Sequence, residues 1–381
     1  MIYITVKQSP SYHQMTLEEF LFNPNPRYSS GLINKNTTNT KTYEVATLSP
    51  IFKQRLNLVH LIKKLSEFNE KTKELSEVPR KELYTTFFIP KKSGGLRQID
   101  APIPSLMDAL RELKNIFEED FGALYHTSAF AYIKKRCTID SVKRHQANES
   151  KWFAKYDLSN FFGSTTLEYV LKMFSMVFPF SEVMKDNVGK RELEKALSLA
   201  FLNGGLPQGT PISPIITNIM MIPVDFTLYN KLRNFNKQTY IYTRYADDFL
   251  ISSRYDFDAK CIENFIVDTL KSFGAPFSIK SSKTRYGSSA GSNWNLGVML
   301  NKDNKITIGH KKKRQFQAML SSYVMDKLNG TNWDLSDVQV LEGYRNYYRM
   351  VEGETIDKIV EHISKKFNVD IVGMVKEDLK S

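Results

Sequence analysis

Two adjacent aspartates are the residues of this sequence that most strongly suggest chemistry. They occur in Tyr245-Ala246-Asp247-Asp248, at the expected turn of an apolar, alternating stretch that is typical of a β-hairpin. Like charges this close repel each other unless a cation lies between them. A metal site is one interpretation and an ordinary acidic β-turn is the other, and the tetrapeptide alone does not decide between them.

A third aspartate ends an apolar strand earlier in the chain. The run 152–157 finishes at Asp157, and Phe161 and Phe162 follow shortly after it. If this strand lies beside the hairpin, three carboxylates meet at one end of a sheet. Such hard oxygen ligands suit Mg²⁺, which completes its shell with waters and substrate phosphates. Two ions held in this way could activate a hydroxyl and stabilise a leaving pyrophosphate, although an aspartate that only caps a turn would give the same pattern.

Two glycine-containing loops could approach a ligand. In Leu206-Pro207-Gln208-Gly209, the glycine allows close backbone approach and the glutamine amide can bond a sugar or a base. Lys91 and Arg97 flank a turn at Gly94 and Gly95, and two basic strands joined in this way can close over a triphosphate. Taken singly, each segment is better explained as a Pro/Gly loop or as a solvated basic hairpin.

The segments around these residues predict an α+β fold. Helical spacing of apolar residues covers 50–76, 104–121 and 215–232, and residues 83–102 are expected to form two strands joined by the glycine turn. Residues 311–328 again show apolar side chains at helical spacing. The expected architecture is a sheet with helices on one side and a helical C-terminal module.

Charge and composition narrow the class of partner. The formal net charge is +12, from 53 Lys and Arg against 41 Asp and Glu, which favours a polyanion over ordinary solubility charge. The two cysteines, Cys137 and Cys261, form no CxxC pair, so a reducing compartment is expected. The N-terminus has no signal architecture and the most apolar stretch carries three prolines, so we expect a cytoplasmic protein without a membrane partner.

Taken together and in this order, D-x-x-x-FF, LPQG-x-x-x-SP and YADD resemble the reverse transcriptases of bacterial retroelements: retrons, group II introns and their defence-associated relatives. The resemblance runs from about residue 84 to 350. It implies a right-hand polymerase with fingers, an antiparallel-sheet palm and a helical thumb. Residues 1–80 would be a mostly helical N-terminal extension with a loop at 23–42, residues 81–305 the fingers and palm, and residues 306–381 the thumb.

The resemblance also implies roles for individual residues. Asp157, Asp247 and Asp248 would hold two Mg²⁺ ions, or Mn²⁺, with the Leu158 carbonyl as a further ligand, and Lys283 would protonate the leaving pyrophosphate. An incoming dNTP would be bound by Lys91, Arg97, Phe162, Gln208 and Gly209, with Phe162 blocking a ribose 2′-hydroxyl. The primer–template would be bound by Leu296 and Gly297 and by the basic run of Lys311, Lys312, Lys313 and Arg314.

Ser213-Pro214 stands where diversity-generating enzymes usually have Ser-Gln, and no maturase-type extension is expected after the thumb, so a retron-like or abortive-infection enzyme fits better than a mobile intron protein. Two departures from the retron pattern remain. Of the retron Asn-Ala-x-x-His motif only His145 matches, and Asn295-Leu296-Gly297 stands where retrons carry Val-Thr-Gly. The implied function is RNA-directed DNA synthesis on a dedicated noncoding RNA, in phage defence or a retroelement, with an effector protein as a further partner. Three alternatives remain: a template-independent or protein-primed DNA polymerase, an RNA-dependent RNA polymerase, against which Phe162 argues, and an idle RNA-binding scaffold, against which the three acids argue.

Overall fold

A four-stranded antiparallel sheet lies at the centre of the computed structural model, which describes residues 3–7, 12–16, 50–90, 94–119, 125–288 and 297–380. The strand order is β6-β7-β5-β8. The bounds are β5 Trp152–Asp157, β6 Tyr240–Tyr245, β7 Asp248–Ser253 and β8 Arg285–Ser288. The β6–β7 hairpin turns at residues 246 and 247, as the sequence predicted, and β7 then pairs with β5 so that Asp157 lies opposite Asp248.

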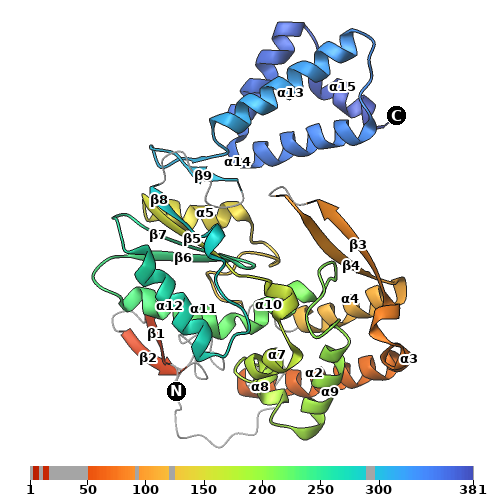
Figure 1. Ribbon diagram of the computed structural model, residues 1–381, viewed down its shortest axis with the longest axis vertical. Helices are drawn as coiled ribbons and strands as arrows, with labels where there is room; N and C mark the ends of the chain where they lie inside the picture. Colours follow the sequence, from red (N-terminus) through yellow and green to blue (C-terminus); the bar gives the residue numbers. More distant parts are fainter. Residues whose placement is uncertain are drawn as a thin grey trace, which may run out of the picture.

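Helices cover both faces of this sheet, whereas the sequence analysis expected them on one. In Figure 1, α11 and α12 lie below the strands and α5 lies above them. These helices span Ile222–Asn234, Ala259–Ser272 and Thr138–Ala147. The reason is the composition of β7, where every residue after Asp248 is buried. A strand that is buried on both faces needs a cover on each side.

The β3–β4 hairpin projects from a helical body (Figure 1). Strand β3 spans Tyr84–Pro90 and β4 spans Leu96–Pro102. Gly94 and Gly95 have φ values of +85° and +78°, which favour glycine, so the predicted turn is present. The body beneath contains α2 Pro50–Lys71, α3 Lys73–Glu77, η3 Arg80–Leu83, α4 Pro104–Glu119, α6 Phe161–Ser164, α7 Leu167–Phe174, α8 Phe180–Val183, α9 Asn187–Ser198 and α10 Ser213–Met220.

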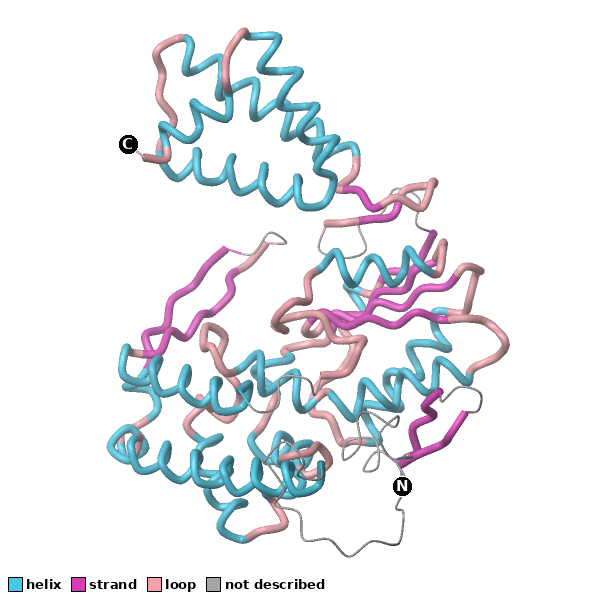
Figure 2. Tube along the Cα trace, turned by 180° about the vertical axis from the view of Figure 1, so that it is seen from behind, coloured by secondary structure: helices cyan, strands magenta, loops and turns pink. Residues whose placement is uncertain are grey.

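A C-terminal helical unit has its own hydrophobic core. It consists of α13 His310–Leu328, α14 Leu335–Phe367 and α15 Ile371–Asp378, and buries residues such as Phe316, Leu341 and Ile371. The short strands β9 Met299–Leu300 and β10 Ile306–Thr307 connect it to the sheet region. Figure 2 shows this unit standing above the sheet, on the side of the molecule toward which the strands of the β3–β4 hairpin extend from the helical body.

Several expected elements need correction. The helix predicted over 215–232 is two helices, because α10 ends at Met220 and Pro223, which has no N–H to donate, falls in the first turn of α11. The described residues of the N-terminal region are mostly helical, in α2 and α3, and the hairpin β1 Tyr3–Lys7 with β2 Tyr12–Thr16 is an addition that the sequence did not predict. The loop expected at 23–42 lies outside the described residues.

The α+β class is confirmed by these layers of helices on a mostly antiparallel sheet. Among the helices that the structure describes, none is long and apolar enough to cross a membrane.

Candidate active site

Three carboxylates meet at one end of the central sheet. Asp157 and Asp248 are opposed residues of β5 and β7, and Asp247 occupies the turn that precedes β7. Ala246 supplies the left-handed backbone of this turn, with φ +57°. The turn is fastened to the neighbouring strand because the Leu158 N–H donates to the Asp247 carbonyl at 3.2 Å.

Two lysines neutralise part of this negative charge. Lys283 Nζ donates to both carboxylate oxygens of Asp157 at 3.0 Å, and Lys155 Nζ donates to Asp248 Oδ2 at 2.6 Å. Lys283 belongs to the short helix η4 Ser281–Lys283, which is tied to the strand by a bond from Lys280 N to the Asp157 carbonyl. Within the described part of the chain no lysine or arginine forms an ion pair with Asp247, so it carries the least compensated charge of the cluster.

The electrostatics of the cluster favour a cation. Burial raises the pKa of Asp247 to about 6, and the nearby carboxylates of Asp248 and Asp157 act in the same direction. Burial also raises the pKa of Asp248, against the lowering effect of Lys155. A positive ion placed among these groups would reverse both effects, because it would stabilise the ionised carboxylates.

The donor set fits a hard divalent cation that arrives with its own ligands. The second oxygen of Asp248, Oδ1, is buried and has no hydrogen-bond partner among the residues that the structure describes. Such an orphaned acceptor is costly unless something binds it. Over the same residues, no group of three or more Asp, Glu, His or Cys side chains is arranged to hold a metal ion by itself. Mg²⁺ needs no such cage, because it is usually held by one or two carboxylates plus waters and phosphates.

Phe162 lies in the short helix α6 and Gln208 lies in the loop before α10, and these two segments touch each other. The Phe162 carbonyl accepts the Leu206 N–H at 3.0 Å, and a Cβ built on Gly205 would lie 2.1 Å from the Gly163 carbonyl oxygen. Gly209 also needs to be glycine: its φ is +119°, and a Cβ there would lie 3.0 Å from the Ile99 side chain. Helix α6 and the Gln208 loop are therefore fixed against each other, and the loop is also fixed against β4. Phe162 itself is half-buried, with its ring edge against Phe161.

The β3–β4 hairpin brings a cation toward the acids. Arg97 is exposed on β4, opposite Ile89. The pKa of the Tyr132 phenol is raised mainly by burial and next by Asp247, whereas Arg97 lowers it. Arg97 and Asp247 thus act on the same phenol from different elements. Tyr132, with φ +59°, was not anticipated from the sequence, where no motif marks it. Lys91 lies outside the described residues.

The basic run at the start of α13 divides into two kinds of residue. Lys311 and Arg314 keep part of their side chains in solvent, as expected for contacts with a polyanion. Lys312 Nζ instead donates to the Gly297 carbonyl at 2.7 Å, and Lys313 Nζ forms an ion pair with Glu352 at 2.6 Å. Half of the run is therefore engaged within the protein. Of the turn expected to bind the primer–template, Gly297 is described, with φ +90°, and Leu296 lies outside the described residues.

Sequence reasoning missed a buried ion pair behind the turn that carries Asp247. The fully buried Arg244 makes a two-pronged contact with Asp225 of α11 at 2.8 Å, and its third nitrogen donates to the Ala246 carbonyl at 3.1 Å. The signal for it was an arginine in an otherwise apolar strand. His145 lies against β6 and β7, 2.8 Å from Thr243 Oγ1 and 2.6 Å from Ser252 Oγ, and burial lowers its pKa to about 3, so it is neutral.

Similarity to known proteins agrees with this geometry. The sequence profile of the family "Reverse transcriptase (RNA-dependent DNA polymerase)" matches residues 89–317. The retron Ec83 reverse transcriptase of Escherichia coli is 27% identical over 307 residues, which are 77% of this chain and 90% of that protein. The retron Ec73 reverse transcriptase, from the same species, is 28% identical over 239 residues, 61% of this chain and 73% of that protein.

Among solved structures, a telomerase from Candida albicans in complex with a fragment of telomeric RNA matches with a TM-score of 0.44 at 12% identity. The match covers 88% of this chain and 62% of that chain, so this chain spans under two thirds of the telomerase. The family profile covers more than half of the sequence and includes the strands that carry all three aspartates. The chain belongs to the reverse transcriptase family of RNA-directed DNA polymerases and is of the retron-like type.

Proposed function

We propose that this protein extends a primer with dNTPs on an RNA template by two-metal-ion phosphoryl transfer. The observation that carries the proposal is the cluster of Asp157, Asp247 and Asp248 at one sheet end, with a buried Asp248 oxygen that lacks a partner among the described residues. The three carboxylates and the Leu158 carbonyl would hold two Mg²⁺ ions, and Mn²⁺ would also suit such oxygen ligands. The ions would supply Lewis-acid stabilisation of the charge that develops on the phosphate oxygens.

The chain's own residues position the reactants. Lys283 is the cation paired with Asp157, and we assign it the proton for the leaving pyrophosphate. Arg97, together with Lys91, would bind the triphosphate from the β3–β4 hairpin. Gln208 and Gly209 would lie against the nucleotide, and the close packing of Gly209 on Ile99 and Asp100 of β4 would hold their loop in place.

We further propose domain limits and partners. Residues 1–80 form the N-terminal extension, 81–305 the fingers and palm, and 306–381 the thumb, which begins at β10 and has a separate core. The template is proposed to be a dedicated noncoding RNA, and the biological role antiphage defence together with an effector protein, because the relatives that match over most of their length are retron enzymes. This last step is an analogy with those relatives.

Phe162→Val is expected to raise ribonucleotide incorporation while largely sparing dNTP use. The half-buried Phe162 ring belongs to α6, and a 2′-hydroxyl against it would lose its hydrogen-bond partners at a cost of roughly 1–3 kcal/mol before any steric overlap. Discrimination should therefore fall by about ten- to a few-hundredfold, at about 1.4 kcal/mol per factor of ten. Steady-state kcat/KM for dNTP and NTP on an RNA template measures this.

Phe161 is the matched control for this experiment. Its ring is buried against Phe277, so Phe161→Val should lower stability and both activities together. If the Phe162→Val enzyme keeps the wild-type preference for dNTP, Phe162 does not block the ribose 2′-hydroxyl. Equal extension with and without the RNA template would favour the template-independent alternative, and a wild-type preference for NTP would favour an RNA polymerase.

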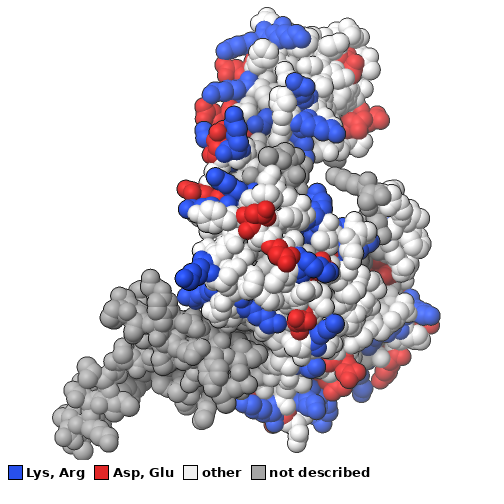
Figure 3. All heavy atoms as spheres, turned by 60° about the vertical axis from the view of Figure 1, so that its left-hand side comes forward, with Lys and Arg blue, Asp and Glu red and all other residues white. Residues whose placement is uncertain are grey.

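The double substitution of Lys311 and Arg314 with alanine is expected to weaken the salt dependence of RNA binding. For each phosphate that the variant no longer binds, the slope of log K against log salt should fall by about one unit. On the face drawn in Figure 3, Lys and Arg are spread over the molecule and mixed with Asp and Glu, so two residues form a small part of the total charge.

The matched control is the double variant Lys63→Ala with Lys71→Ala. It removes the same charge from α2, which lies at the opposite end of the molecule (Figure 1). If both double variants shift the slope equally, the effect is one of net charge and the assignment of Lys311 and Arg314 to the RNA backbone fails.

A further inference from the structure

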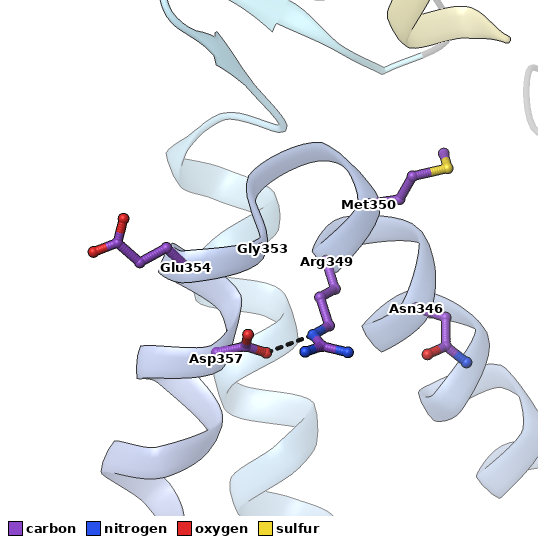
Figure 4. A pocket seen from close by; sticks show the side chains of 6 residues that line it. All are labelled: Asn346, Arg349, Met350, Gly353, Glu354 and Asp357. Carbon is purple, nitrogen blue, oxygen red and sulfur yellow. Dashed lines mark hydrogen bonds and ion pairs between the residues drawn. The ribbon is translucent and has the colours of Figure 1, made fainter.

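The longest helix of the C-terminal unit is broken at Glu352. Within α14, Glu352 has φ −139° and ψ 59°, outside the helical region. Glutamate is a good helix former, so its own preference does not explain the break. Figure 4 shows the chain turning at this point, with Arg349 before the break reaching Asp357 after it, and the ion pair between them measures 2.8 Å. A surface cavity of about 630 Å³ lies beside this bridge.

The Glu352 carboxylate accepts three hydrogen bonds from the region that links the sheet to α13. Oε2 accepts from Thr307 Oγ1 at 2.7 Å and from the Ile308 N–H at 2.8 Å, and Oε1 pairs with Lys313 Nζ at 2.6 Å. Only 12% of the side chain is exposed. Bonds of this kind to a charged, shielded acceptor are stronger than those between neutral groups. We call Thr307, Ile308, Lys313 and Glu352 the thumb clamp.

The thumb clamp fastens the thumb at the point where it leaves the palm. Thr307 belongs to β10, and its Oγ1 also accepts the Gly309 N–H at 3.0 Å, immediately before α13 begins. The β9–β10 connection is fixed to α5 by reciprocal bonds between Gln146 and Asn304 at 2.8 and 2.9 Å. The thumb clamp therefore joins the entry of the thumb, which is anchored on the palm, to the middle of its longest helix.

An apolar contact lies next to the thumb clamp and connects the same two parts. Val142 of α5, Phe153 of β5 and Leu250 of β7 form a buried cluster with Leu300 of β9 and Val298, which precedes that strand. Tyr347 and Val351 of α14 pack against this cluster just before the break. The apolar contact places the first half of α14 against the palm, and the hydrogen bonds of Glu352 tie the residue at the break to the start of α13. A buried polar network of this sort specifies one arrangement when all of its members are satisfied.

We propose that Glu352 is a positioning residue that sets the angle of the thumb over the palm, and thereby the number of nucleotides added in one encounter with a primer–template. The inference rests on the proposed polymerase function. Glu352 touches neither the acid cluster nor the residues assigned to the nucleotide, so it acts on retention of the primer–template and leaves the bond-forming step unchanged. The charge of Lys313 is used for this purpose, which removes it from the set of residues available to phosphates.

The test compares single-nucleotide addition with the length of products made in one binding event. Enzyme is loaded on a primer annealed to an RNA template, and dNTPs are added together with excess unlabelled primer–template as a trap. For Glu352→Ala the rate of first addition should stay within about twofold of wild type, whereas the chance of extension over dissociation should fall about tenfold, equivalent to about 1.4 kcal/mol. Glu352→Gln keeps an oxygen acceptor for Thr307 and Ile308 but loses the charge that pairs with Lys313. Its chance of extension over dissociation should lie between the values for wild type and Glu352→Ala.

Glu354→Ala is the matched control. Glu354 lies two residues further along α14 and also pairs with a lysine, Lys358 at 2.6 Å, but both side chains are exposed. Its removal should leave product length unchanged. In addition, Lys313→Met and Glu352→Gln should be non-additive in product length, because they break the same bond.

Three outcomes would overturn the proposal: unchanged product length in Glu352→Ala, a first-addition rate that falls in parallel with product length, or full additivity with Lys313→Met. Failure of the wild-type enzyme to extend any primer is a different outcome. It would reject the proposed polymerase function and, with it, the proposed role of Glu352.

Discussion

Replacing Asp247 with alanine is expected to abolish primer extension without unfolding the protein. The carboxylate is one of three at the sheet end, and Ala246, its neighbour in the turn, carries no charge that could replace it. A bound metal contributes several kcal/mol to a phosphoryl-transfer transition state, so the rate should fall about a thousandfold or more. Primer extension at saturating dNTP, with a circular-dichroism spectrum of each variant, measures both effects.

The loss of the Asp247 charge should also change stability in a pH-dependent way. Because burial and neighbouring carboxylates raise the pKa of Asp247 to about 6, above its unfolded value, its ionised form is disfavoured in the folded protein. This destabilisation is present above pH 6 and disappears as the pH falls below the unfolded pKa of about 4. In metal-free buffer, Asp247→Asn should therefore melt at a higher temperature than wild type at pH 7.5 and at about the same temperature at pH 4.

Asp268→Ala is the control for both measurements, since Asp268 is an exposed aspartate on α12, away from the acid cluster. It should alter neither activity nor the pH dependence of melting. Full activity of Asp247→Ala would reject the site, and an Asp247→Asn protein that melts lower than wild type at pH 7.5 would show that the carboxylate is stabilised by contacts rather than strained by its neighbours.

Removing Asp225 is expected to cost about 3–5 kcal/mol of folding stability, because it leaves the guanidinium of Arg244 buried and unpaired. Both side chains are fully shielded from solvent, and Tyr242 and Asn218 complete the hydrogen bonds around them. Urea unfolding of Asp225→Ala measures the change. A decrease under about 1 kcal/mol would show that the pair is solvated or dispensable.

A second variant tests whether the Asp225–Arg244 pair, besides stabilising the fold, supports the turn that carries Asp247. Replacing both partners, Asp225→Leu with Arg244→Met, removes the unpaired charge, and buried ion pairs exchanged for apolar residues often recover stability. The Ala246 carbonyl would still lack its donor, however, so the turn that carries Asp247 would lose its support from behind. We expect the double variant to unfold at a urea concentration close to that of wild type but to extend primers more slowly than wild type. Recovery of both would limit Arg244 to a folding role.

The site could be predicted from sequence where the pattern is local. The hairpin turn, the strand that ends at Asp157 and the loop around Gly209 all follow from alternation, turn residues and short motifs. Which lysine meets which carboxylate could not be predicted. Lys283 is far from Asp157 in sequence, and only the docking of η4 at the end of β5 brings them together.

The same reason explains the residues that were missed. Arg244 looks like a misplaced charge in an apolar strand until α11 places Asp225 beside it. Glu352 looks like one more surface residue of a long helix until the packing of β10 makes it an acceptor. The run from Lys311 to Arg314 looks uniform in sequence because nothing local distinguishes a lysine that faces solvent from one that reaches a carbonyl. Contacts between distant segments decide these cases, and a single sequence does not contain them.

The close approach of the Gly163 and Gly205 backbones couples two segments that lie far apart in the sequence. No side chain separates the backbones, and a single added carbon would act as a wedge between them. Helix α6 with Phe162 and the loop with Gln208 are therefore coupled through their backbones. If Phe162 selects the sugar and Gln208 contacts the nucleotide, as we propose, Gly205→Ala is expected to disturb both functions together.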